Sequence, residues 1–387
     1  MTSGLNRREW LRAAGLGALG AALLPRATLL RAQPSPHSPP PLDPPHAHIN
    51  LAGNENPFGP APAVVQAIFR AAPQSSRYPF REEAILRELI AKKEDVAPEN
   101  IVLANGCDEL LALAAVHAAQ SVPAGRTGEL VATHPTYFQL TDYAAKVGLR
   151  LRWVDHEPRT MRHDLAGLAA AVGPATRLAY LCNPDNPTGT LRPAGEIAAW
   201  CREIAPRCPV FIDEVYLELQ PDFAAQTQVP LVRAGLPVII GRSFSKLHGM
   251  AGHRIGYGIT TPALATALAR WQMSSLNYVG VAAARASLQE TSFLRYSARK
   301  IEEGRARFCA LLDELGLRYT PSHGNFVFHH VRRSAEDYQA AMKARGFLVG
   351  WPHPPVAPYL DWCRVSIGTD DEMARLATAM RAEFATA

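Results

Sequence analysis

The stretch SFSKLHGMAGHRIGY, residues 243–257, carries the most information about how this chain folds. It follows the apolar run 238–241 directly, so we expect it to form a loop at the end of a buried strand. The amine of Lys246 can form an imine with a carbonyl group, although a lone lysine is far more often a surface residue. The nearby hydroxyls of Ser243 and Ser245 and the guanidinium of Arg254 match a phosphate-binding loop and favour the chemical role.

Short apolar runs alternate with helical stretches on both sides of this loop. The runs are 130–133, 149–154, 178–182, 210–212, 238–240 and 255–259, and the helical stretches include 109–119, 194–205 and 263–273. Apolar strands separated by helices predict an α/β fold with a mainly parallel sheet covered by helices. Ligands bind such sheets at the carboxyl ends of the strands, so motifs that are distant in sequence can meet in one crevice.

The pattern changes after about residue 280 and predicts a smaller C-terminal domain of the α+β class. A long helical stretch, 287–315, ends just before Gly316, a residue type that favours a helix C-cap. Strands are expected at 326–331 and 363–367, with a helix at 336–344. The predicted divisions are an N-terminal segment 1–32, a proline-rich arm 33–60, a large domain 61–275 and a small domain 276–387.

Two further motifs place polar side chains after apolar runs. In FIDEVY, residues 211–216, Asp213 can keep the ring nitrogen of an aromatic cofactor protonated, and Tyr216 can hydrogen-bond to its phenolate oxygen. Alternatively, Asp213 could cap the N-terminus of a helix, since aspartate is common at that position after a strand. In NPDNPTG, residues 183–189, the prolines and the glycine make a turn under any interpretation, and the amide of Asn186 can reach the same oxygen.

Another motif, NGCDE at residues 105–109, opens a predicted helix. Backbone amides at a helix start bind phosphate well, so Gly106, Cys107 and Asp108 are candidate phosphate ligands. An ordinary capped helix explains the motif about as well. The ring of Tyr137, in HPTY, can stack on an aromatic cofactor.

In this order the motifs resemble the fold-type-I aminotransferases that depend on pyridoxal phosphate (PLP). The resemblance covers most of the chain, from about residue 51 to 369, and is closest to the histidinol-phosphate aminotransferase branch. That branch is indicated by NENPFG at 54–59 and by RYP at 77–79. The resemblance implies PLP as the cofactor and an obligate homodimer with its site at the subunit interface.

The resemblance also implies a role for each motif residue. The catalytic set would be Lys246 for the imine, Asp213 for the pyridinium, and Asn186 with Tyr216 for the phenolate oxygen. The phosphate cup would be Gly106, Cys107, Asp108, Ser243, Ser245 and Arg254, and Tyr137 would stack on the ring. Arg364 would clamp the substrate carboxylate, with Asn325 and Asn54 on the substrate side. Tyr78 would reach the cofactor phosphate of the neighbouring subunit.

Such an enzyme moves an amino group between an amino acid, or a histidinol-phosphate-like amine, and a 2-oxo acid by a ping-pong mechanism. One alternative is a PLP-dependent decarboxylase or lyase of the threonine-phosphate decarboxylase type, since no motif fixes which substrate bond breaks. Arg364 favours transamination, because it would retain the carboxylate. A second alternative, a non-enzymatic binding protein on this fold, has less support because the catalytic set is complete.

One departure from the branch concerns the substrate. Where the branch commonly has an arginine for the substrate phosphate, this chain has Gly350, followed by Trp351. The missing charge-assisted contact corresponds to roughly 1.5–3 kcal/mol for a phosphate, and an indole favours flat or apolar side chains. We therefore expect aromatic or other neutral amino acids to be better donors than histidinol phosphate.

Residues 1–32 resemble a twin-arginine export signal. Arg7 and Arg8 precede an apolar run at 13–24 that is too short to span a bilayer comfortably. The pattern predicts a periplasmic or exported protein that meets the membrane only transiently, during export. The alternative is a cytoplasmic protein whose basic N-terminus is never used as a signal.

The composition is that of a globular protein with no indication of nucleic-acid or metal binding. Of 387 residues, 48% are hydrophobic and 19% are charged, which excludes an intrinsically disordered chain. Five arginines against one glutamate give residues 1–32 a net charge of +4 of the total +5, so no broad basic patch remains for nucleic acid. The six cysteines show no metal-binding spacing, and most are expected to be buried free thiols.

Overall fold

The computed structural model describes residues 48–350 and 357–385, and from His48 onward the chain forms one compact unit. The predicted export signal, most of the predicted arm and Trp351 lie outside the described residues. The domain boundary at 275/276 stays a prediction. No helix in the described part of the chain is long and apolar enough to cross a membrane.

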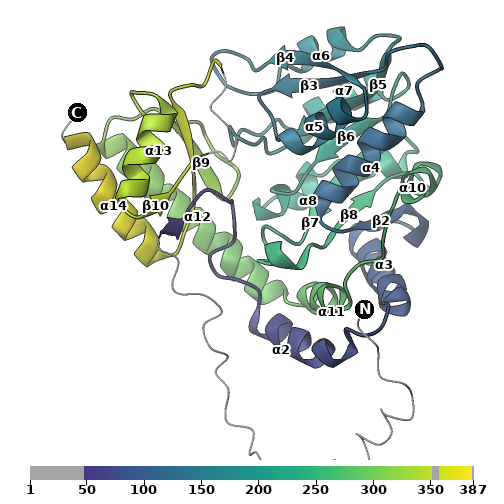
Figure 1. Ribbon diagram of the computed structural model, residues 1–387, viewed down its shortest axis with the longest axis horizontal. Helices are drawn as coiled ribbons and strands as arrows, with labels where there is room; N and C mark the ends of the chain where they lie inside the picture. Colours follow the sequence, from purple (N-terminus) through teal and green to yellow (C-terminus); the bar gives the residue numbers. More distant parts are fainter. Residues whose placement is uncertain (1–47, 351–356, 386–387) are drawn as a thin grey trace, which may run out of the picture. The chain divides into compact units, whose positions relative to one another are not determined.

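The largest element is a seven-stranded sheet (Figure 1). Its strands lie in the order β2 (Ile101–Ala104), β8 (Gly256–Ile259), β7 (Val238–Ser243), β6 (Val210–Asp213), β5 (Thr176–Cys182), β3 (Glu129–His134) and β4 (Arg150–Asp155). All neighbours are parallel except the two pairs made by β8. The prediction of a mainly parallel sheet is therefore confirmed, although the four-residue strand β2 was missed.

Helices cover both faces of this sheet and bury two separate apolar cores. One core includes side chains from α2 (Pro62–Ala71), α3 (Phe80–Glu94), α6 (Leu165–Ala171), α7 (Ala194–Ile204), α9 (Val229–Arg233) and α11 (Tyr278–Ser287). The other includes α4 (Cys107–Gln120), α5 (Phe138–Lys146) and α10 (Pro262–Ala269). Because strand side chains alternate, Val210 and Ile212 of β6 enter the first core and Phe211 enters the second.

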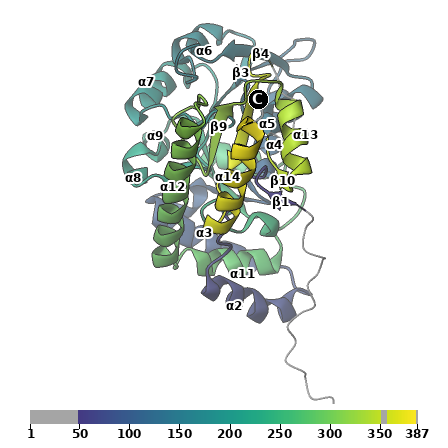
Figure 2. The same cartoon turned by 90° about the vertical axis from the view of Figure 1, so that its left-hand side faces the viewer.

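The C-terminal elements build a third core. They are α12 (Thr291–Glu314), β9 (Phe326–His330), α13 (Ala335–Ala344), β10 (Phe347–Leu348), β11 (Trp362–Ser366) and α14 (Asp370–Ala385). β9 and β11 pair antiparallel, and β10 pairs with the N-terminal strand β1 (Ile49–Asn50). In Figure 2 α12 and α14 run side by side, and Leu51 joins their core. The end of the predicted arm thus packs against the C-terminal elements.

The helix predicted at 287–315 corresponds to α12, which begins four residues later than expected, at Thr291. The preceding helix α11 was not predicted, and residues 288–290 separate the two helices. The break lets α11 stay in a core of the large sheet while the end of α12 packs in the C-terminal core. Gly316 lies just beyond α12 at a φ of 63°, as expected of a C-cap glycine. The helix predicted at 263–273 ends earlier, at Ala269.

The remaining short elements connect the main ones. They are the four-residue helix α8 (Phe223–Gln226) and the 3-10 turns η1 (Ala72–Gln74), η2 (Pro98–Asn100), η3 (Leu217–Leu219) and η4 (Ala251–His253). All six cysteines are free, and every one except Cys309 is buried. The expectation of buried thiols is therefore confirmed.

Candidate active site

The loops that carry the motifs meet at one edge of the seven-stranded sheet. The register aligns Asp213 at the end of β6 with Gly241, and Ser243 at the end of β7 with Gly256 at the start of β8. Because β8 runs antiparallel to its neighbours, its first residue lies at the edge where β6 and β7 end. Arg254, just before β8, comes to the same edge for this reason. Sheet topology thus brings the motifs together.

Lys246 lines a cavity of about 190 Å³ at this edge. Its Nζ donates to the carbonyl oxygen of Gly53 at 3.3 Å and lies 5.6 Å from the centre of the Tyr216 ring. Burial lowers the pKa of the Lys246 ammonium to about 8, and the positive charge of Arg364 acts in the same direction. In a fraction of the molecules the Lys246 amine is therefore uncharged near neutral pH, as a nucleophilic amine requires.

Asp213 is buried and has one unsatisfied carboxylate oxygen. Its Oδ1 accepts a hydrogen bond from the Val215 N–H at 3.2 Å, whereas Oδ2 accepts none of regular geometry from the described residues. Burial raises the pKa of Asp213 to about 7. The carboxylate bonds within its own loop and the next helical turn begins only at Leu217, so Asp213 does not cap a helix. A buried carboxylate with one oxygen that lacks a hydrogen-bond donor suits a cationic N–H donor.

Two side-chain amides converge on the hydroxyl of Tyr216. Nδ2 of Asn186 donates to it at 3.2 Å, and Nδ2 of Asn54 donates to it at 3.0 Å. Oδ1 of Asn186 accepts a hydrogen bond from Nη1 of Arg364 at 2.6 Å. Burial raises the pKa of Tyr216 above its usual value, so the hydroxyl keeps its proton and remains a donor. The group can present several donors to one oxygen atom.

A cradle for an anion lies at the start of α4. Gly106 has a φ of 79°, which favours glycine, and a Cβ at this position would lie 2.2 Å from Nη2 of Arg254 and displace that guanidinium. Nη2 of Arg254 donates to Oδ2 of Asp108 at 2.8 Å, and its Nη1 lies 3.3 Å from Oγ of Ser245. With the first amides of α4, which begins at Cys107, these groups match a phosphate-binding site.

Two further predicted residues border this cradle. The hydroxyl of Tyr137 donates to Oδ1 of Asp108 at 2.9 Å, and the Tyr137 ring lines the same cavity as Lys246. Oγ of Ser243 accepts a hydrogen bond from the Ser245 N–H at 3.0 Å and thereby shapes the loop before the lysine. A ring, an anion cradle, a lysine and a carboxylate therefore surround one space.

Residues 47–380 match the family described as aminotransferase class I and II. The chain belongs to this family. It is 36% identical over 346 residues to histidinol-phosphate aminotransferase 2 of Ralstonia nicotianae, covering 88% of this chain and 89% of the relative. It is 33% identical over 335 residues to the histidinol-phosphate aminotransferase of Moorella thermoacetica, covering 86% of this chain and 84% of the relative.

A solved structure agrees with the sequence relatives. Histidinol-phosphate aminotransferase from Sinorhizobium meliloti, in complex with pyridoxal-5'-phosphate, has a TM-score of 0.79 and 32% identity to this chain, with 88% and 91% of the two chains covered. The chain is therefore a PLP-dependent aminotransferase of fold type I. This resolves the alternatives in favour of transamination.

The residues of this aminotransferase fit PLP. The unsatisfied Oδ2 of Asp213 suits the protonated ring nitrogen, and the Gly106–Arg254 cradle, which a Cβ would fill, suits the phosphate. When bound, PLP supplies an aldehyde for an amine and a ring that withdraws electrons from the substrate carbon. Lys246 is the residue placed to hold that aldehyde. The individual roles remain predictions, but the structure brings the named side chains to one cavity.

The residues predicted for the substrate side belong to the C-terminal elements and to the segment after β1. Arg364 on β11 is buried, and besides Asn186 its guanidinium donates to the carbonyl oxygen of Ala52. Nδ2 of Asn325 donates to the carbonyl oxygens of Asn54 and Glu55 at 2.9 and 3.2 Å. Asn325 therefore acts on the backbone of the Asn54 loop, and Arg364 is joined to the catalytic group through Asn186.

Some site residues went unrecognised, and one predicted residue lies elsewhere on this chain. Gly53 and Glu55, the sequence neighbours of Asn54, line the Lys246 cavity; Glu55 belongs to the motif NENPFG, which could have indicated it, and Gly53 directly precedes the motif. Oγ of Ser366 fixes Asn54 by accepting a hydrogen bond from its N–H at 2.8 Å. No local sequence pattern near either residue predicts this contact. Tyr78 is 76% exposed and does not line the Lys246 cavity. That position is consistent with its predicted role toward another subunit.

Proposed function

We propose that this aminotransferase prefers aromatic or other neutral amino acids over histidinol phosphate as amino donors, with Arg364 holding the donor carboxylate. The observation that carries the proposal is the backbone at Gly350. Its φ is 109°, and a Cβ there would lie 2.4 Å from Nε2 of Gln339. The amide of Gln339 is the end of a flexible side chain and could move aside, but the positive φ would strain any residue other than glycine, so the backbone disfavours a phosphate-binding guanidinium at this position.

Gly350 also lies next to the residue that would hold the carboxylate. The Gly350 N–H donates to the carbonyl oxygen of Arg364 at 2.8 Å, and Nη2 of Arg364 lies 3.5 Å from the carbonyl oxygen of Gly350. A donor bound to Arg364 would therefore direct its side chain past a residue with neither charge nor bulk. This arrangement supports donors without a phosphate.

The chain's own groups account for the proton movements of the proposed cycle. With PLP bound, the uncharged amine of Lys246 would accept the proton from the donor Cα and deliver it on the cofactor side. Asp213 would keep the ring nitrogen charged, and Asn186 with Tyr216 would donate to the ring oxygen. The two half-reactions use the same residues in opposite directions, so ping-pong kinetics are expected.

The test of donor preference compares kcat/KM for phenylalanine, tyrosine, histidine and histidinol phosphate under one set of conditions. The proposal expects a neutral amino acid to exceed histidinol phosphate by about tenfold, the size of one lost charge-assisted contact. If histidinol phosphate is better by that margin, the missing arginine is replaced by another cation and the proposal fails.

We also propose a homodimer in which Tyr78 reaches the cofactor phosphate of the other subunit. Tyr78 stacks on Phe80 with ring centres 5.5 Å apart, and Phe80 and Met273 line one surface groove. Phe80 is 67% exposed and Met273 95%, an amount of exposed apolar surface that supports burial by a partner. Light scattering should give twice the chain mass, and Tyr78→Phe should weaken PLP retention. A monomer that retains PLP fully contradicts the proposal.

Export through a twin-arginine route is proposed from the sequence of residues 1–32 alone. Arg7→Lys combined with Arg8→Lys keeps the charge but removes the arginine pair, so mature periplasmic protein should be lost. Unchanged periplasmic yield would mean that this segment is a general secretory signal or no signal.

A further inference from the structure

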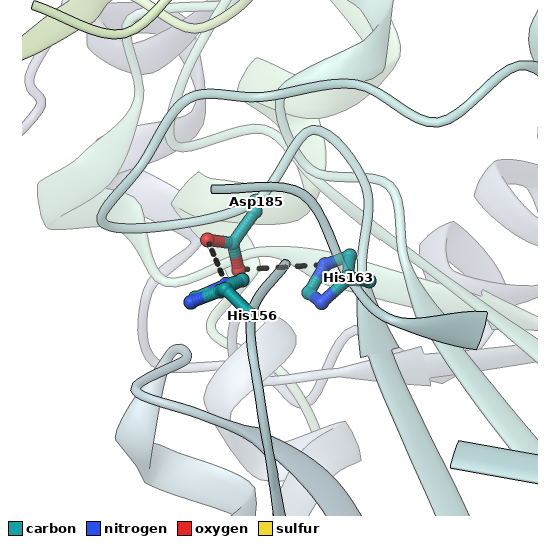
Figure 3. A group of neighbouring side chains, drawn as sticks. All are labelled: His156, His163 and Asp185. Carbon is teal, nitrogen blue, oxygen red and sulfur yellow. Dashed lines mark ion pairs between the residues drawn. The ribbon is translucent and has the colours of Figure 1, made fainter. Parts of the chain in front are cut away.

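Two histidines and an aspartate that the catalytic set does not use lie together (Figure 3), and the aspartate directly precedes Asn186 in the chain. His156, His163 and Asp185 are all buried. Oδ2 of Asp185 lies 3.2 Å from Nε2 of His156, and Oδ1 lies 3.5 Å from Nε2 of His163. A carboxylate so deeply buried needs partners, because burying an unpaired charge is costly.

Asp185 fixes the loop that carries Asn186. Its Oδ2 accepts hydrogen bonds from the hydroxyl of Thr188 at 2.7 Å and from the Thr188 N–H at 3.3 Å. Its Oδ1 accepts from the hydroxyl of Thr136, the residue before Tyr137, at 3.3 Å. Burial alone would raise the pKa of Asp185, but the histidines and Thr188 outweigh it and hold the pKa below its usual value. The carboxylate therefore joins the loop that carries Asn186 to the loop that carries Tyr137.

His163 anchors this group to the ends of two strands. Its Nδ1 lies 2.8 Å from the hydroxyl of Thr133 on β3, and its Nε2 lies 2.7 Å from the carbonyl oxygen of Cys182 on β5. Burial lowers the pKa of His163 to about 4, so the ring is neutral at physiological pH. Both ring nitrogens already have partners, which favours a structural arrangement over a metal site.

His156 connects the group to the strand that carries Arg364. Its Nδ1 lies 3.3 Å from the hydroxyl of Tyr359, a buried residue just before β11. Tyr359 bonds through its carbonyl oxygen to the N–H of Trp362, the first residue of β11, at 3.2 Å. Arg364, two residues further along, donates back to Asn186, which is the neighbour of Asp185. The contacts form a closed circuit between the substrate and cofactor sides.

We propose that His156, Asp185 and His163 form a positioning unit that sets Asn186 against the cofactor ring and couples it, through Tyr359, to the Arg364 strand. None of the three touches the reacting atoms, so they are positioning residues. The inference rests on the proposed roles of Asn186 and Arg364, but not on which donor the enzyme prefers. Donor-carboxylate binding at Arg364 and hydrogen bonding to the cofactor ring oxygen are then linked through one buried carboxylate.

The first test is Asp185→Asn in the PLP-loaded enzyme. The change removes the negative charge that faces both histidines and leaves one oxygen instead of two to accept from the hydroxyls of Thr188 and Thr136, so Asn186 should lose its fixed orientation. A weaker hydrogen bond to the ring oxygen raises the pH midpoint of the lysine-bound cofactor's visible absorbance, by about half a pH unit or more. This titration needs no donor, so it stays informative even if the donor preference is wrong. KM for the best donor should rise together with the midpoint.

The second test isolates the link to Arg364. Tyr359→Phe removes only the hydroxyl, and His156→Gln removes its partner. Each variant should raise KM by about threefold to tenfold, as for the loss of one hydrogen bond. The KM of the double variant should be little higher than that of the single variants, because both changes break the same contact between Tyr359 and His156. The matched control is Tyr338→Phe, since Tyr338 is buried in the C-terminal core and its hydroxyl has no hydrogen-bond partner among the described residues. This control should leave KM unchanged.

Three outcomes overturn the proposal. The first is an Asp185→Asn enzyme that loses thermal stability but keeps the wild-type absorbance midpoint and KM, which would make the unit purely structural. The second is additive effects of Tyr359→Phe and His156→Gln. The third is a stoichiometric metal in the purified wild type, together with Zn²⁺ raising the Tm of wild type but not of His163→Gln, which would identify a metal site. If Asp185→Asn does not fold, the Tyr359→Phe results alone support or overturn the coupling.

Discussion

The cofactor half and the substrate half of the active site are built in different ways. Asp213 and Ser243 end strands of one sheet, Gly106 lies just after another, and the sheet register brings all three to one edge. The substrate half depends instead on tertiary contacts such as that between Asn54 and Ser366, which are 312 positions apart. A sheet edge is rigid and locally encoded, whereas the substrate half must be assembled by folding. Changes in the two halves should therefore differ in size and in kind.

The largest effect is expected in the cofactor half, from Asp213→Asn. A neutral amide cannot stabilise the ring nitrogen's positive charge, so the rate should fall by roughly a thousandfold, about 4 kcal/mol. The attachment of PLP to Lys246 should survive, because the phosphate cradle is unchanged. Single-turnover kinetics measure the loss, and a variant within tenfold of wild type would mean that another residue serves the nitrogen.

In the substrate half, Arg364→Gln should affect donor binding more than cofactor binding. Loss of a charge-assisted contact to the carboxylate should raise KM by about tenfold to a hundredfold. Since the charge of Arg364 also lowers the pKa of Lys246, the pKa of that amine should rise in the apo-variant. Steady-state kinetics and the pH dependence of PLP attachment check both parts. Unchanged KM would remove Arg364 from the carboxylate site.

A change one contact further from the substrate should be milder. Oγ of Ser366 accepts the Asn54 N–H and donates to Oδ1 of Asn54 at 3.0 Å, and it holds Asn54 at a φ of 51°. Ser366→Ala should raise KM by about fivefold, as expected for roughly 1 kcal/mol, and leave the cofactor absorbance unaltered. Ser121→Ala, which removes a hydroxyl bond at the far end of α4, is the control. An altered absorbance would mean that the two halves are not separable here.

The smallest effect concerns the stability of the apo-enzyme. Asp213 has a pKa raised to about 7 from 3.8, so the folded state binds its proton more tightly than the unfolded state. This contribution to stability is complete below about pH 4 and is lost as the pH rises through 7. The difference between the Tm of apo Asp213→Asn and the Tm of apo wild type should therefore shift in favour of the variant by a few degrees when the pH rises from 4.5 to 8. A constant difference across this range would contradict a raised pKa.

The contrast between the halves also explains what the sequence could predict. Lys246, Asp213 and Asn186 were found because each follows an apolar run, which is a local pattern. Asn54 and Arg364 were named only through a family resemblance, since nothing near them in sequence shows that they meet at Asn186 and Tyr216. The contacts that join them depend on the docking of β1 and β11, which is a property of the folded chain.

Other features could not be predicted for similar reasons. Asp185 was interpreted only as part of a turn, because its partners His156 and Tyr359 belong to distant segments. Helix α11 was not predicted and the start of α12 was placed four residues early, because the division between these helices is set by which core each one joins. Local patterns therefore predicted the elements, and the packing between elements had to come from the structure.

The most direct test of the whole arrangement is the covalent position of the cofactor. PLP-loaded enzyme reduced with borohydride and then digested should carry a single pyridoxyl group, on the peptide that contains Lys246. Lys246→Ala, which keeps the Gly106–Arg254 cradle, should bind PLP without covalent attachment and carry no label. A label on any other lysine, or a label that persists in Lys246→Ala, would contradict the account.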